Sequence, residues 1–142
     1  MFALKALAIV LLGGLLSTGA ALAMDRTPAP DGAEVYIVSP DDGATVSNPV
    51  TVVFGLRGMG VAPAGTEREN TGHHHLIIDA PLPPGDEHIP SDENHVHFGG
   101  GQTETTIELK PGEHTLQLLL GDLNHLPHDP VIASEQITIT VE

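Results

Sequence analysis

The chain contains no cysteine and no tryptophan, and only five of its 142 side chains are basic. The lack of cysteine excludes disulfide bonds and thiolate metal ligands, so stability must come from packing or partly from a bound ion. The 19 Asp and Glu residues give the chain a formal net charge of −14. A charge of this sign argues against partners that are themselves anionic, namely nucleic acids and acidic membranes.

The N-terminus has the pattern of a secretory signal peptide. A short basic start is followed by an apolar run over 6–16, and Ala21-Leu22-Ala23 fits the small-x-small cleavage rule. The apolar run is short for a membrane span, which needs about 20 residues, and no later stretch is long enough to cross a bilayer. We therefore predict a signal peptide over 1–23, cleavage after Ala23, and a periplasmic or secreted location.

The remaining sequence predicts one all-β domain. Residues 24–33, spotted with Asp, Pro and Gly, predict a disordered lead-in, and no later stretch shows a sustained helical period. Runs with period-two alternation predict strands at 34–38, 49–56, 74–79, 103–109, 113–120 and 134–141, with a short strand within 94–98. Residues 34–142 are therefore predicted to form an immunoglobulin-like antiparallel β-sandwich of about six to seven strands, with a small barrel or jelly roll as the alternative.

Seven of the nine histidines fall into three short groups, at 73–75, 95–97 and 125–128. Histidine is the commonest metal ligand in proteins and titrates near neutral pH. Strand direction alternates in a simple antiparallel sandwich, which maps all three groups to one pole of the predicted fold. Loops at such a pole build sites on a rigid scaffold.

The spacing within these groups predicts a transition-metal site. Residues two apart on an extended chain point to the same side, so two of the groups each offer a chelating pair. Zinc and copper(II) both accept imidazole ligands. The predicted ligands of copper(II) or zinc are His73, His75, His95 and His97, with His125 or His128 assisting. Acceptors for the second ring nitrogens are expected among Asp79, Asp92, Glu93 and Asp122.

The other histidines fit structural roles. His74 shares a strand face with Leu76, which favours a core position. His114 alternates with Leu116 and the leucines beyond it, which favours a core histidine whose ring nitrogens are hydrogen bonded. His88 lies in a proline-rich loop and is expected to be solvated.

Two other functions stay open. The first is a metal-free interaction module, in which the histidines form a structural network that shapes loops for a periplasmic protein or a glycan partner. The second is an enzyme, but the sequence has no Gly-x-Ser-x-Gly elbow, no cysteine nucleophile and no phosphate-binding loop. Only metal chemistry with an open coordination position is then left for catalysis, and no catalytic residue is predicted.

Several motifs together resemble a bacterial family known as a domain of unknown function, DUF4399. The motifs are Ser39-Pro40-Asp41-Asp42-Gly43-Ala44-Thr45-Val46, Gly55-Leu56-Arg57-Gly58-Met59-Gly60-Val61-Ala62-Pro63-Ala64-Gly65, Gly72-His73-His74-His75-Leu76-Ile77-Ile78-Asp79, His97-Phe98-Gly99-Gly100-Gly101-Gln102-Thr103-Glu104, Pro111-Gly112-Glu113-His114-Thr115-Leu116-Gln117-Leu118-Leu119-Leu120-Gly121-Asp122 and His125-Leu126-Pro127-His128. The resemblance covers nearly all the chain after residue 23. It implies an exported bacterial protein and brings no activity with it.

Overall fold

The computed structural model describes residues 24–142, and the predicted signal peptide at 1–23 lies outside the described residues. The strands of this part of the chain are β1 (Glu34–Ser39), β2 (Thr45–Val46), β3 (Val50–Arg57), β4 (Gly60–Val61), β5 (Thr71–Ile78), β6 (His95–His97), β7 (Glu104–Ile107), β8 (Gly112–Gly121) and β9 (Ile137–Val141). Residues 24–142 form no helix that is long and apolar enough to cross a membrane.

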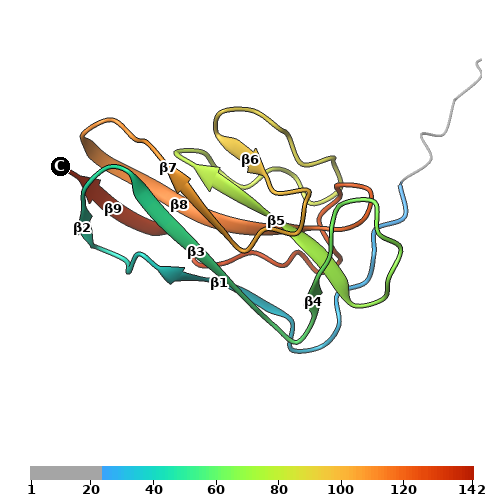
Figure 1. Cartoon of the computed structure of the whole chain (residues 1–142). Helices are drawn as coiled ribbons and strands as arrows, with labels where there is room; N and C mark the ends of the chain where they lie inside the picture. The colour runs from blue at the N-terminus through green and yellow to red at the C-terminus, as the bar shows by residue number, and fades with distance from the viewer. Residues whose placement is uncertain (1–23) are drawn as a thin grey trace, which may run out of the picture.

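The strands form two sheets that pack against each other (Figure 1). The smaller sheet has the order β1-β3-β7, and the larger has the order β2-β9-β8-β5-β4 with β6 also paired to β5. The long pairings are antiparallel, whereas the two short edge pairings, β2 with β9 and β4 with β5, are parallel. The predicted all-β sandwich is confirmed, with these two parallel edges as the departure from a purely antiparallel arrangement.

The main hydrophobic core lies between the two sheets. Val52 and Phe54 of β3 meet Leu76 of β5, Leu118 of β8 and Ile139 of β9 there. Core residues recur at every second position along a strand, because successive side chains of a strand point to opposite faces. Burial of this apolar surface, at about 25 cal/mol per Å² removed from water, is the main favourable contribution to folding.

Strand β5 is buried on both faces along nearly its whole length, and so is the second half of its neighbour β8. On the outer face of the larger sheet, Ile77 forms a second small core with Leu119 of β8 and Ile89. Ile89 belongs to the connection after β5, and Ala133, from the connection after β8, packs against the same group. Two chain connections therefore cover this face of the sheet, which is the face that the odd-numbered residues of β5 share.

The histidines at 73–75 lie inside a strand. The sequence predicted a strand over 74–79, but β5 begins at Thr71, where Gly60 of β4 pairs with it. Pairing with β8 then places His73 opposite Gly121. The run sits on the sheet itself, near the end where β5 begins and β8 ends.

The segment 24–33, which the sequence predicted to be disordered, is hydrogen bonded to the connection after β8. The Asp129 amide donates to the Thr27 carbonyl and the Ala29 amide donates to the Asp129 carbonyl, both at 2.9 Å. Arg26 forms an ion pair with Asp129 at 3.5 Å. These contacts join segments far apart in the sequence, and the composition of 24–33 alone does not indicate them.

Candidate metal centre

Strand β5 divides its three consecutive histidines between the two faces of the larger sheet. His74 points into the main core, where it is fully buried with its ring centroid 5.1 Å from that of Phe54. His73 and His75 point to the outer face and are each only 1% exposed. The alternation of a strand causes this division, and His74 takes the core position that the sequence favours.

Two further rings complete a cluster on the outer face. His97 of β6 lies opposite His75, with the ring centroids 5.1 Å apart. His125, from the connection after β8, has its ring centroid 4.7 Å from that of His97 and 5.0 Å from that of His73. We call these four residues the histidine cluster: His73, His75, His97 and His125.

Ring nitrogens of three residues of the histidine cluster converge. His97 Nε2 and His125 Nε2 are 3.0 Å apart, a hydrogen bond when one of them carries the proton. One nitrogen from each of His73, His97 and His125 lies within 4.8 Å of the other two. His73 Nε2 and His75 Nδ1 are buried and find no hydrogen-bond partner in residues 24–142. Buried polar atoms are nearly always bonded, and metal ligation would satisfy these two nitrogens. Both ring nitrogens of His74 also find no partner in residues 24–142, but that ring lies against Phe54 on the opposite face of the sheet.

Lowered pKa values keep three rings of the histidine cluster, those of His73, His75 and His97, in the neutral form near pH 7. Burial, reinforced by the neighbouring imidazoles, lowers the pKa of His73 to about 4 and that of His75 to about 3. The pKa of His97 is lowered by burial and by the nearby His125. Neutral imidazole is the form that ligates metal, so the environment prepares these rings for a cation without the need to remove protons.

Two glycines let the cluster rings lie close to the backbone. A Cβ atom added at Gly121 would stand 2.7 Å from Cε1 of His75, and one added at Gly99 would stand 2.4 Å from Cε1 of His97. Both separations are shorter than real side chains tolerate. Each ring is therefore packed over a glycine, which fixes its place on the sheet.

A tight turn presents His125 to the cluster. His125 has a positive φ of 62°, an uncommon conformation for a residue with a side chain. The Asp122 carboxylate holds this turn by accepting hydrogen bonds from the amides of Asn124 at 2.8 Å and Leu126 at 3.0 Å. Burial acts to raise the pKa of Asp122, but hydrogen bonds from Leu126, Thr27 and Asn124 outweigh it and leave the pKa below its usual value.

His95 does not join the histidine cluster, although the sequence paired it with His97. It lies opposite Ile77 in the ladder, two residue pairs along from the pair of His75 and His97. Its Nδ1 is 2.8 Å from Oδ1 of Asp92, and this hydrogen bond lowers the pKa of Asp92. The register of β6 against β5 separates the two histidines, and spacing in the sequence cannot reveal that register.

His128 also lies outside the group of converging nitrogens. Its ring is buried, and Nε2 donates to the Thr71 carbonyl at 3.3 Å, while Nδ1 is unpartnered within the described residues. Burial lowers its pKa. Of the six histidines predicted as ligands, the structure thus brings four together and holds the other two beside them.

The acceptors predicted for the second ring nitrogens of the ligands bond to groups outside the histidine cluster. Asp92 bonds to His95, Asp79 bonds to His114, and Asp122 binds backbone amides. Sequence reasoning missed the roles of Gly99 and Gly121, because neither a glycine in a turn, as at 99, nor one at the end of a strand, as at 121, gives a sign of which ring it faces. It also missed the turn function of Asp122, whose only sequence signal is an Asp at the end of a strand followed by Asn and a histidine.

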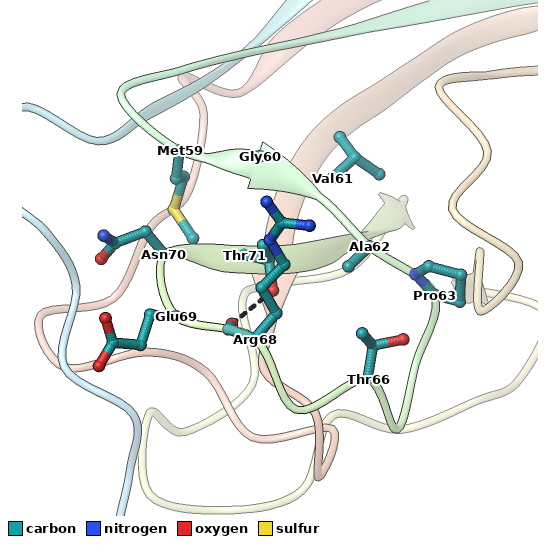
Figure 2. A pocket seen from close by; sticks show the side chains of 10 residues that line it. All are labelled: Met59, Gly60, Val61, Ala62, Pro63, Thr66, Arg68, Glu69, Asn70 and Thr71. Carbon is teal, nitrogen blue, oxygen red and sulfur yellow. Dashed lines mark hydrogen bonds between the residues drawn. The ribbon is translucent and has the colours of Figure 1, made fainter.

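A pocket of about 580 Å³ lies beside the first residues of β5, away from the cluster rings. Figure 2 shows it between β4 and the loop that returns to β5, with Arg68 extending across it and the Thr71 hydroxyl bonded to the Arg68 carbonyl. Its walls combine apolar side chains such as Met59 and Val61 with this arginine. No histidine lines this pocket.

These features define a β-sandwich protein with a buried histidine cluster on the outer face of its larger sheet. The chain belongs to the family described as "Domain of unknown function (DUF4399)", whose model matches residues 52–142. The matched segment contains all four rings of the cluster. No curated protein and no solved structure matches the chain.

Proposed function

We propose that this chain is an exported protein that binds a single copper(II) or zinc ion through the histidine cluster. The convergence of four imidazoles, two of which carry buried ring nitrogens without partners in residues 24–142, is the observation that carries the proposal. His73, His97 and His125 are the principal ligands, and His75 is the fourth. The export rests on the signal-peptide pattern of residues 1–23, which predicts a periplasmic or secreted location.

The spacing of the ring nitrogens supports this assignment. Four nitrogens about 2.1 Å from a tetrahedral ion lie about 3.4 Å from one another. The 3.0 Å between Nε2 of His97 and Nε2 of His125 is close to that value. The ligand nitrogen of His73 lies within 4.8 Å of both, so a ring movement of at most about 1.4 Å brings it to that spacing.

The chemistry of the donors supports copper(II) or zinc. The chain has no cysteine, and Met59 packs against the main core, so nitrogen is the only soft donor in the cluster. Imidazole sites suit zinc and copper(II), whereas copper(I) prefers sulfur ligands. The formal charge of −14 adds a general attraction for cations.

A metal-free interaction module is the second candidate. The hydrogen bond between His97 and His125 favours it, because two of the four rings can satisfy each other without an ion. In that case the cluster orders the connection after β8 for a protein or glycan partner. This reading leaves Nε2 of His73 and Nδ1 of His75 without a role.

Retained metal distinguishes the two candidates. The full-length gene is expressed without a histidine tag, and the exported product is exposed to equal copper(II) and zinc, desalted and analysed by elemental mass spectrometry. We expect near-stoichiometric metal in the wild type and in a His88→Ala control, since His88 is exposed and outside the cluster. A His97→Ala/His125→Ala double variant should lose it. A wild type that retains no metal, or a double variant that retains as much, would overturn the proposal.

A further inference from the structure

The carboxylate of Asp122 is fully engaged although nothing in the histidine cluster bonds to it. Asp122 is 1% exposed. Its Oδ1 accepts from the amides of Asn124 and Leu126 at 2.8 and 3.0 Å. Its Oδ2 accepts from the Thr27 hydroxyl at 2.8 Å and from the Thr27 amide at 3.4 Å. One oxygen therefore holds the turn after β8, and the other ties that turn to the N-terminal segment.

The turn that Oδ1 holds sets the direction of His125. The His125 amide donates to the Asp122 carbonyl at 3.0 Å, and the Asp122 amide donates to the Leu126 carbonyl at 2.8 Å. The Ile89 amide closes the arrangement by donating to the His125 carbonyl at 2.9 Å. Holding a residue with a side chain at positive φ is unfavourable by itself and persists only where surrounding contacts fix it. Asp122 provides two of those contacts through its side chain.

The N-terminal segment, whose Thr27 bonds to Oδ2 of Asp122, has further contacts with the connection after β8. We call residues 26–29 the N-terminal strap. Besides the two hydrogen bonds between its backbone and Asp129, Arg26 Nε donates to the Pro127 carbonyl at 3.1 Å. The strap thus contacts the connection on both sides of His125 in the sequence, at Asp122 and at 127–129. It lies before residue 52, where the match to the family model begins.

We infer that Asp122 is a positioning residue for the metal ligand His125, and that the N-terminal strap locks Asp122 and so forms part of the metal site. The inference rests on the proposed function. Because coupling between two sites is reciprocal, an ion held by His125 also strengthens the anchoring of the strap. The N-terminal strap should then be more ordered when an ion occupies the histidine cluster than when the cluster is empty.

A purely structural role for Asp122 makes a different prediction. A carboxylate that only stabilises the turn would change the free energy of unfolding and leave the geometry around a bound ion unaltered. A positioning residue changes the ion's surroundings and its affinity. Residues that orient metal ligands typically cost about 10- to 100-fold in metal affinity when they are removed.

The experiment measures zinc affinity by chelator competition and the d–d spectrum of bound cobalt(II), whose intensity reports coordination number. We expect Asp122→Asn, which keeps an oxygen for the turn but loses the Thr27 amide bond and the charge, to weaken zinc binding about tenfold or more and to alter the cobalt spectrum. Thr27→Val should weaken binding by a smaller factor, and Thr27→Ser should restore it. Thr51→Val is the matched control, since the Thr51 hydroxyl bonds to Thr106 on the other sheet.

Two further measurements test the inference, and the second uses the wild type, so it holds even if Asp122→Asn folds poorly. In a His125→Ala background, Asp122→Asn should add little loss of zinc affinity, because its effect passes through His125. Zinc should also slow hydrogen exchange of the Thr27 and Ala29 amides. A wild type that binds neither zinc nor copper(II) defeats the proposed function. A wild type that binds normally, with unchanged affinity and spectrum in both Asp122→Asn and Thr27→Val, defeats only the positioning role.

Discussion

Histidines lie near both ends of strand β8, and the hydrogen bonding of their ring nitrogens differs between the two ends. At the start of the strand, His114 has a partner for each ring nitrogen: Nδ1 bonds to Asp79 Oδ2 and Nε2 to the Lys110 carbonyl, both at 2.7 Å. At the far end, His73 lies opposite Gly121 in the middle of three other imidazoles. Its Nε2 is without a partner anywhere in the described residues.

The difference teaches how this fold separates a structural histidine from one that is available for binding. The hydrogen bond to Asp79 and that to the Lys110 carbonyl raise the pKa of His114, whereas burial lowers the pKa of His73. Leaving a buried polar atom unsatisfied costs about 1–3 kcal/mol. The histidine cluster is therefore a source of instability in the metal-free protein, and a bound cation would convert it into a source of stability.

The largest expected effect of this difference is a loss of stability at low pH. The pKa of His73 in the folded protein is about 4 against an ordinary 6.5, so the unfolded chain binds the extra proton first as the pH falls. As the pH falls from 6.5 to 4 the folded state is destabilised progressively, on the order of 3 kcal/mol for His73 alone, because its buried ring resists the proton that the unfolded chain takes up. His75, whose pKa falls to about 3, acts in the same direction.

Urea unfolding of the metal-free protein from about pH 7.5 to about pH 5 tests this loss, in a range where ordinary carboxylates stay ionised. We expect the free energy of unfolding to fall steadily across the range. A His88→Ala control should show the same slope, because that ring is exposed. A free energy of unfolding that stays flat would mean that the rings of His73 and His75 are not held neutral and would remove the contrast with His114.

A smaller effect is expected from filling the space under one cluster ring. Gly121→Ala places a Cβ 2.7 Å from Cε1 of His75 and 3.2 Å from Cδ1 of Ile89, so the ring must move. Overpacking of this kind destabilises by about 1–3 kcal/mol and should also weaken zinc binding. Gly60→Ala is the matched control, because its nearest neighbour would be the Thr71 methyl at 3.7 Å. Equal urea midpoints for the two variants would show that His75 is loosely held.

Much of the fold could be predicted from the sequence because it follows from short-range alternation. Period-two patterns located the long strands, and the same alternation separates His74 from its two neighbours in the run. The edges were harder to predict. Strands of two residues such as β2 and β4 carry too little pattern to detect, and they exist because neighbouring strands offer them free hydrogen-bonding groups.

The candidate site could be predicted only in part, for a physical reason that differs at each residue. His73 and His75 follow from alternation, but choosing His97 over His95 depends on the register between β5 and β6. His125 depends on a turn that Asp122 and the distant Thr27 hold together. Register and long-range side-chain contacts are properties of the packed molecule, and no local pattern encodes them.

The smallest effect is expected at His114, and its sign is opposite to that of the cluster. The raised pKa of His114 means that its charged form is favoured in the folded protein. Its contribution is complete below the unfolded value of 6.5 and disappears as the pH rises through the raised pKa. His114→Gln should therefore cost about 1 kcal/mol or less near pH 6 and still less near pH 9. If the loss instead grew with pH, the ring of His114 would be held neutral like those of the cluster, and the two ends of β8 would not differ in kind.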